Sequence, residues 1–244
     1  MTTLATPADR LKPLVTSLLL CLFLLAVGCS SGSDGPSRSS QNLQKGSFTD
    51  PEGNTYVTVK IGDQWWMAEN LRVTRYRNGD PIDHTAEADT WFNSTAGAWC
   101  HVENNPAFTA TYGLLYNGFA VNDPRGLAPD GWHIPSDQEW QTLVSHLGPT
   151  NPGGKAKAVG TSHWFPPNLG ATNESGFSGL PAGVRPPIGS FTNRGEIVFF
   201  WTTTVAIPPP VVHLWLRGLG YAETEFRHQM VPLQMGLSVR CVMD

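Results

Sequence analysis

Charged residues are scarce in this sequence, and neither sign dominates. Asp, Glu, Lys and Arg make up 15% of the 244 residues, and the formal net charge is −4. Binding to nucleic acid depends largely on Lys and Arg side chains that neutralise phosphates. Because the chain is mildly acidic and has no basic stripe, we expect no nucleic-acid partner.

Motifs of common enzyme active sites are also absent. Residues 46–244 contain no Gly-x-Ser-x-Gly, no His-Glu-x-x-His and no glycine-rich phosphate loop. We therefore predict a non-catalytic protein, with a carboxylate pair assembled from distant segments as the alternative. The histidines are scattered and show no metal-ligand spacing on one helix: His84, His101, His133, His146, His163, His213 and His228.

Long apolar runs are confined to the N-terminus. Arg10 and Lys12 precede the uncharged segment 14–27, which is too short for a stable membrane span and is typical of a secretory signal. The small residues just before Cys29 resemble a bacterial lipobox, in which the cysteine is acylated and becomes the N-terminus of the mature protein. An ordinary cleaved signal, with Cys29 incidental and the protein freely secreted, is the alternative.

We therefore divide the chain into three parts: a signal peptide (1–28), a tether that begins with lipidated Cys29 (29–45), and one domain (46–244). The tether is polar and too poor in apolar residues to fold. Several acyl chains on Cys29 would anchor the protein stably to a membrane. Ser30 is not the Asp that retains some lipoproteins at the inner membrane, so we expect the outer membrane or cell surface.

Cysteine is sparse, with four in the chain, and Cys21 lies in the signal peptide. In an oxidising compartment, Cys100 and Cys241 would most simply form a disulfide. Two buried free thiols are the alternative.

The local patterns of the domain predict an α+β fold. Alternating residues over 55–61 and 64–68 flank Gly62-Asp63 and indicate a hairpin, in which one of Trp65 and Trp66 faces the core. Ser136 and Glu139 form a capping box before an apolar stripe, which predicts a helix that ends at Gly148. The chain between 72 and 130 is irregular. A short helix is expected at 155–159, and strands at 197–203, 211–217 and 237–242.

Several segments together resemble the Fibrobacter succinogenes major paralogous domain, which is common in exported lipoproteins. They are Val59 to Leu71 (VKIGDQWWMAENL), Tyr112 to Tyr116 (YGLLY), Gly131 to Trp140 (GWHIPSDQEW), Thr172 to Gly183 (TNESGFSGLPAG) and Gly236 to Val242 (GLSVRCV). The resemblance covers about 46–244.

More distantly, GWHIPSDQEW and GLSVRCV are similar to segments of the formylglycine-generating-enzyme branch of the C-type-lectin-like fold. This resemblance implies a small twisted antiparallel sheet, one or two helices and long irregular loops that carry any ligand site. The chain departs from the family at Ala128-Pro129-Asp130, where many members have Cys-Pro. That departure puts the pairing of Cys100 with Cys241 in doubt. A formylglycine-type oxidase would also need a reactive cysteine pair, whereas these two look structural.

We therefore expect a surface-displayed domain that recognises an extracellular ligand such as a glycan. A structural or assembly protein that binds another envelope protein is the alternative. Aromatic faces stack on sugars, although core packing is the alternative role for each aromatic residue. The ligand-binding candidates are Trp91, Trp99, Trp164, Trp215 and Tyr221.

No cofactor is expected, and calcium is the alternative. The tripeptides of calcium-dependent sugar-binding lectins are absent from the sequence. Oxygen-bearing side chains in loops provide the only calcium candidates: Glu103, Asn173 and Glu174.

Overall fold

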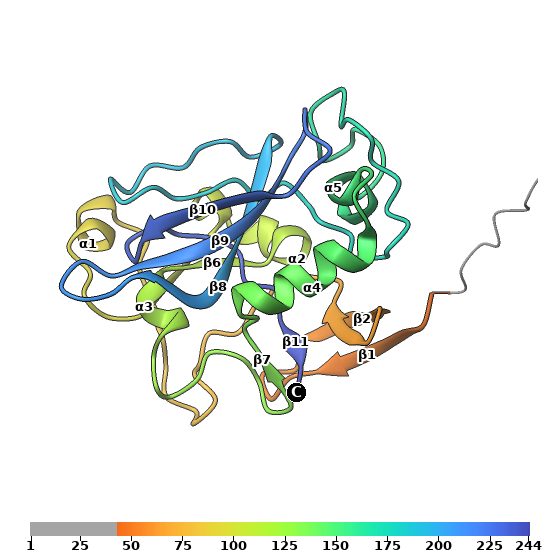
Figure 1. Ribbon diagram of the computed structural model, residues 1–244. Helices are drawn as coiled ribbons and strands as arrows, with labels where there is room; N and C mark the ends of the chain where they lie inside the picture. The colour runs from red at the N-terminus through yellow and green to blue at the C-terminus, as the bar shows by residue number, and fades with distance from the viewer. Residues whose placement is uncertain (1–42) are drawn as a thin grey trace, which may run out of the picture. The chain divides into compact units, whose positions relative to one another are not determined.

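The computed structural model describes residues 43–244, which lie in one compact unit, Gln41–Asp244. The predicted signal peptide, Cys29 and most of the predicted tether lie outside the described residues. The described chain is an α+β domain with mostly antiparallel sheets and five short α-helices, which confirms the predicted class (Figure 1). None of these helices is long and apolar enough to cross a membrane.

The first sheet contains the predicted hairpin, and its two strands meet at a turn where Gly62 has a positive φ of 62°. Trp66 is fully buried and Trp65 is half-buried, as the alternation predicted. An additional edge strand precedes the hairpin. The strand order is β1-β2-β3-β11-β7, formed by Lys45–Thr49, Thr55–Ile61, Gln64–Met67, Val242–Met243 and Trp132–His133.

The second sheet has the order β10-β9-β8 and forms a long hairpin with a third strand beside it. Two of its strands were predicted and prove longer than expected: β8 (Ile197–Ile207) and β9 (His213–Gly220). The third, β10 (Arg227–Pro232), was not predicted. The predicted strand 237–242 was mostly wrong, because only its last residue belongs to β11 and the rest makes isolated bridges.

The third sheet lies in the segment that looked irregular in the sequence. Its order is β4-β5-β6, with a parallel β4–β5 pair and an antiparallel β5–β6 pair. Short helical turns separate these strands. The elements are β4 (Asp83–His84), α1 (Ala88–Phe92), β5 (Ala98–His101), η1 (Val102–Asn104), η2 (Pro106–Phe108), α2 (Thr109–Tyr112), β6 (Leu114–Tyr116) and α3 (Gly118–Val121).

The longest helix, α4 (Asp137–Leu147), begins at the predicted capping box. The Ser136 hydroxyl accepts from the Glu139 amide at 3.2 Å, and the Glu139 carboxylate accepts from the Ser136 amide at 2.8 Å. Each of these bonds satisfies an amide that the first helical turn leaves without a partner. The next helix, α5 (Pro152–Ala156), lies slightly before the predicted position.

The core is made largely of aromatic side chains between α4 and the sheets. Trp66 lies 4.8 Å from Trp140 between ring centroids, and Trp140 lies 5.3 Å from Phe200. A second cluster of buried residues surrounds Tyr116 and Trp201. Large rings fill the space between irregular backbone segments, which is how a loop-rich chain obtains a sizeable core.

A lysine is also fully buried in this core. The Lys157 ammonium donates to the carbonyls of Leu169, Gly220 and Glu223 at 2.8, 2.9 and 2.8 Å. Arg240 is likewise buried and donates to the Asn70 side chain at 2.8 and 3.0 Å. These side chains join loops that are far apart in the sequence.

Candidate functional site

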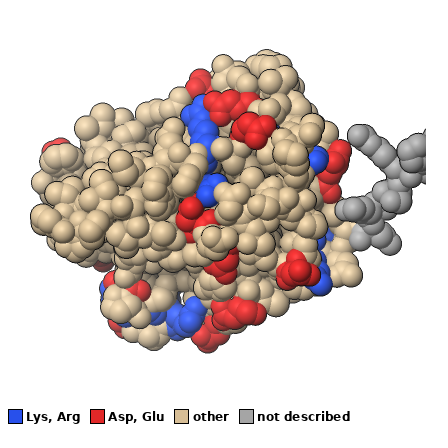
Figure 2. Space-filling view, viewed as in Figure 1, with Lys and Arg blue, Asp and Glu red and all other residues tan. Residues whose placement is uncertain are grey.

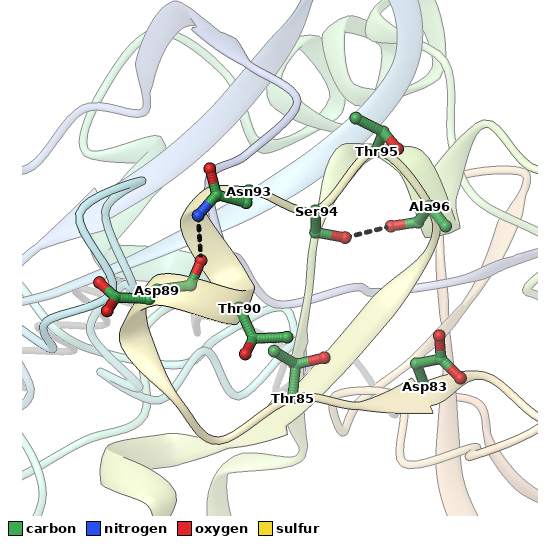
Figure 3. A pocket seen from close by; sticks show the side chains of 8 residues that line it. All are labelled: Asp83, Thr85, Asp89, Thr90, Asn93, Ser94, Thr95 and Ala96. Carbon is green, nitrogen blue, oxygen red and sulfur yellow. Dashed lines mark hydrogen bonds between the residues drawn. The ribbon is translucent and has the colours of Figure 1, made fainter.

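A cavity of about 510 Å³ opens beside α1, between that helix, β4 and the loop that leads into β5. Its lining side chains are small and almost all polar, and they come from one continuous part of the chain (Figure 3). The lining residues are Asp83, Thr85, Asp89, Thr90, Asn93, Ser94, Thr95 and Ala96.

The short helix α1 is held in place by its one buried residue, Trp91. The indole nitrogen of Trp91 donates to the carbonyl of Gln234 at 2.8 Å. Gly236 lies against the ring, and a Cβ at that glycine would be 2.8 Å from the indole. Since Trp91 faces inward, Asp89 and Asn93 are on the side that lines the cavity.

Arg185 fixes the segment between β4 and α1 from below. Its guanidinium donates to the carbonyls of Thr85 and Ala86 at 2.5 and 2.6 Å and to that of Gly189 at 3.0 Å. It also lies 4.4 Å from the centroid of the Trp91 ring. Arg185 is fully buried, so the floor of the cavity rests on a residue about a hundred positions further along the chain.

The cavity has an excess of hydrogen-bond acceptors and negative charge. No Lys or Arg is among its lining residues, and neither Asp83 nor Asp89 forms an ion pair within residues 43–244. Figure 3 shows these two carboxylates on opposite sides of the cavity. Thr85 is only 6% exposed, and its hydroxyl is directed into the cavity (Figure 3). Such small polar side chains suit a hydroxyl-rich or amine-bearing ligand.

Of the five predicted aromatic residues, Trp91 and Trp164 are buried, and the prediction that they could stack on a ligand was wrong. Each is 1% exposed. The Trp164 indole donates to the Gly179 carbonyl at 3.0 Å. Their hydrophobic area contributes to the core, which was the alternative interpretation.

Trp99 lies on the opposite face of the β4–β5 pair from Asp83, half-buried. The ring of His84 stacks on it at 4.3 Å and 23°, and His101 meets its edge at 5.2 Å. Its indole donates to the Ile82 carbonyl at 3.0 Å. One face of Trp99 is therefore already covered.

Trp215 and Tyr221 lie in and just after β9, and both are half-buried. The His228 ring stacks on Trp215 at 4.3 Å and 27°. The same histidine lies 3.1 Å from the Asp137 carboxylate. Tyr221 packs against the core cluster that contains Trp164. The structure thus does not gather the five predicted aromatics into one site.

The predicted disulfide between Cys100 and Cys241 is contradicted, since both are buried free thiols. Cys100 lies on β5 in one core cluster, and Cys241 lies before β11 in the other. Burial raises the pKa of Cys100 to about 11 and that of Cys241 to about 12. The alternative of two buried thiols is what the structure shows.

The calcium candidates do not come together with other ligands. The Glu103 carboxylate pairs with Arg194 at 2.8 Å, and the Asn173 side chain bonds with that of Ser178 at 2.9 Å. Glu174 is exposed. Among residues 43–244, no group of three or more His, Cys, Asp and Glu side chains is arranged to hold a metal ion.

A second surface feature is apolar. In Figure 2, the part of the face over the ends of β8 and β9 farthest from β1 carries few Lys, Arg, Asp or Glu side chains. Three apolar residues of this region are well exposed: Val205, Val211 and Met230.

The sequence reasoning missed the cavity, because none of its lining side chains belongs to a familiar motif. A signal was nevertheless present. The segment from Asp83 to Ala96 contains seven Asp, Thr, Asn and Ser residues and three alanines around one tryptophan, a pattern in which the tryptophan anchors the loop and the small side chains stay accessible.

Comparison with known families gives one match. The model of the Fibrobacter succinogenes major domain matches residues 59–243, which include the second half of the hairpin, the cavity, α4 and the C-terminal strands. Neither a curated protein nor a solved structure matches the chain.

Proposed function

The chain belongs to the Fibrobacter succinogenes major domain family, and from this premise we propose a non-catalytic, lipid-anchored domain that binds an extracellular glycan in the α1 cavity. The observation that carries the proposal is the cavity itself. It is an open hollow of about 510 Å³, and its lining side chains include carboxylate, amide and hydroxyl groups. Sugar hydroxyls pair well with such groups, and this volume lies within the range of ~300–1,000 Å³ typical of ligand sites.

The position of the cavity supports a role in recognition at a distance from a membrane. The chain enters the domain at β1, and Figure 1 places β1 and α1 at opposite ends of it. A lipid at Cys29 followed by the polar tether would hold the β1 end toward the bilayer and leave the cavity facing outward. We further propose that this surface is that of the outer membrane.

We also propose that the domain is a C-type-lectin-like variant. The short helices, small antiparallel sheets and long loop segments support this assignment. In such a domain the ligand site would lie in the loop region, and the α1 cavity does.

A glycan array probed with the purified full chain in mild detergent tests the proposal. Thr95 is exposed and lines the cavity, so Thr95→Trp should fill it without disturbing the core. The matched control is Thr150→Trp, at an exposed position outside the lining. Binding that Thr95→Trp abolishes and Thr150→Trp preserves would support the proposal. The absence of binding to every glycan by the folded protein would refute it.

The anchor is tested separately. Cys29→Ala should prevent acylation and move the protein from the membrane fraction to the soluble fraction. If the variant still fractionates with membranes, the lipid anchor is wrong, whatever the cavity binds.

The second candidate function is assembly with another envelope protein. It is favoured by the apolar surface at the ends of β8 and β9, where Val205, Val211 and Met230 are exposed by 48%, 61% and 49%. Exposed apolar patches often mark protein interfaces. Crosslinking in intact cells that captures one partner, and that Val211→Asp prevents while Thr95→Trp does not, would favour this function over glycan binding.

A further inference from the structure

We propose that the α1 cavity selects a sugar that carries a free amino group, such as a glucosamine unit, over neutral and acidic sugars. This inference rests on the proposed glycan-binding function and concerns the same site. Its first support is the charge balance of the lining, which contains two carboxylates, Asp83 and Asp89, and no cationic side chain.

Arg185, which donates to the Thr85 carbonyl, forms no ion pair with either carboxylate within residues 43–244. Arg185 donates through all three of its nitrogens to backbone carbonyls beneath the cavity. It is fully buried and is not part of the lining. Glu87, the exposed N-cap residue of α1, adds a third carboxylate to this region.

The second support is the side chain of Thr85. This residue is only 6% exposed, and its hydroxyl forms no hydrogen bond with another group of residues 43–244. Its hydroxyl is directed into the cavity (Figure 3). This hydroxyl is not one of the fully buried, unpartnered polar atoms of residues 43–244, so it is open to the cavity, where a ligand group could bond to it. The Thr85 hydroxyl therefore marks where a bound ligand would make a hydrogen bond.

These two features together define the ligand chemistry. A protonated amine offers three donors and a positive charge, and it can reach a carboxylate while the ring hydroxyls bond to Thr85, Thr90 or Asn93. A uronic acid or a sulfated sugar would bring a second negative charge to Asp83 and Asp89. Acetylation of the amine removes the charge and leaves a single donor, so an N-acetylated sugar should bind less tightly.

Calorimetric titration of the purified full chain in mild detergent tests this selectivity. The probes are a glucosamine tetrasaccharide, its fully N-acetylated counterpart and an oligouronate, at about pH 6, where the amine of the sugar is protonated. We expect the glucosamine oligomer to bind about tenfold more tightly than the acetylated one, as one charge-assisted hydrogen bond would give. Added salt should weaken the binding.

Three variants locate the effect. Asp83→Asn and Asp89→Asn keep the shape of each side chain and should each weaken glucosamine binding by about three- to tenfold, because each removes one charge. Asp63→Asn removes a charge from an exposed turn and should leave binding unchanged. Thr85→Val should weaken the binding of every sugar that enters the cavity.

The outcomes separate this inference from the proposed function. Neutral glycans that bind as tightly as glucosamine, with loss in Thr95→Trp only, would overturn the amine selectivity and keep the proposed function. Equal effects of Asp63→Asn and Asp83→Asn, or equal binding of a lysine peptide, would also overturn it. If no sugar binds at all, the proposed function fails first.

Discussion

Replacing Lys157 with methionine tests whether a buried cation holds the loops of this domain together. Methionine has a similar length and keeps the apolar stem, but it cannot donate the three hydrogen bonds to Leu169, Gly220 and Glu223. The Gly220 carbonyl also accepts from the Glu223 amide at 3.3 Å. Two of the three carbonyls would therefore lose their partner.

The expected loss of unfolding free energy follows from those two carbonyls. A buried acceptor left without a partner costs about 1–3 kcal/mol, so two cost about 2–6 kcal/mol. The substitution also removes the desolvation penalty of a buried ammonium, which offsets part of this cost. We therefore expect Lys157→Met to destabilise the domain by about 3 kcal/mol, a large part of the 5–15 kcal/mol typical of a folded protein.

Urea unfolding followed by tryptophan fluorescence measures this loss, and Trp164 lies beside Lys157 as a reporter, with 5.6 Å from the ammonium to the ring centroid. Lys155→Met is the control, since Lys155 is half-buried and, within residues 43–244, its ammonium donates to the Leu147 carbonyl alone. We expect it to cost about 1 kcal/mol or less. Equal losses for the two variants, or a loss below about 1 kcal/mol for Lys157→Met, would refute the reasoning.

Three further predictions concern other parts of the fold. Ser136→Ala removes half of the capping box and should cost about 1 kcal/mol, seen as a lower Tm, whereas an unchanged Tm would contradict the role of the cap. Burial alone would lower the pKa of His133, but its hydrogen bonds to carboxylates, including that of Glu139, outweigh burial and raise the pKa. Burial alone would raise the pKa of Glu139, but its hydrogen bonds outweigh burial and lower the pKa. The stabilisation that His133 contributes is thus complete below its unfolded pKa of 6.5 and is lost as the pH rises through its folded pKa. The stabilisation that Glu139 contributes is complete above its unfolded pKa of 4.5 and is lost as the pH falls through its folded pKa. His133→Gln should therefore lower the free energy of unfolding most between pH 4.5 and 6.5. The loss should be less than about 1 kcal/mol, because the pair is partly exposed. A difference between variant and wild type that does not change with pH would contradict this prediction. Cys100 and Cys241 should resist thiol reagents in the folded protein and react in urea without reductant, as peptide mass mapping would show; a disulfide-linked peptide would contradict the fold.

The features that the sequence predicted well are those fixed by local chemistry. The capping box at Ser136 and Glu139 and the spacing of the apolar residues after it are enough to place α4. Alternation alone gives the β2–β3 hairpin and the expectation that one of Trp65 and Trp66 faces the core; the structure shows that it is Trp66. These signals lie within a dozen residues, so no knowledge of the rest of the chain is needed.

The features that were missed depend on distant parts of the chain. The strand β10 is largely exposed and lacks apolar alternation, so only its pairing with β9 defines it. Arg185 and Lys157 look like surface residues in a sequence, and their burial depends on carbonyls contributed by other loops. The α1 cavity was missed because its lining side chains match no familiar motif, and because the burial of Arg185 against the Thr85 and Ala86 carbonyls depends on contacts between distant segments.

The disulfide was wrong for a related reason. The rule that two cysteines in an oxidising compartment pair assumes that the fold brings them together, and no local pattern reports whether it does. Here Cys100 and Cys241 lie in different core clusters.

The three buried cations have a consequence for the environment in which the domain stays folded. None of them forms an ion pair with a carboxylate within residues 43–244; they are Lys157, Arg185 and Arg240. They donate instead to carbonyl and amide oxygens, and the two arginines also lie against aromatic rings. Such acceptors do not take up protons in mild acid, and because they are buried, dissolved ions screen them little. The connections between loops should therefore survive acidic or salty surroundings that loosen carboxylate bridges, a property suited to the cell-surface location that we propose.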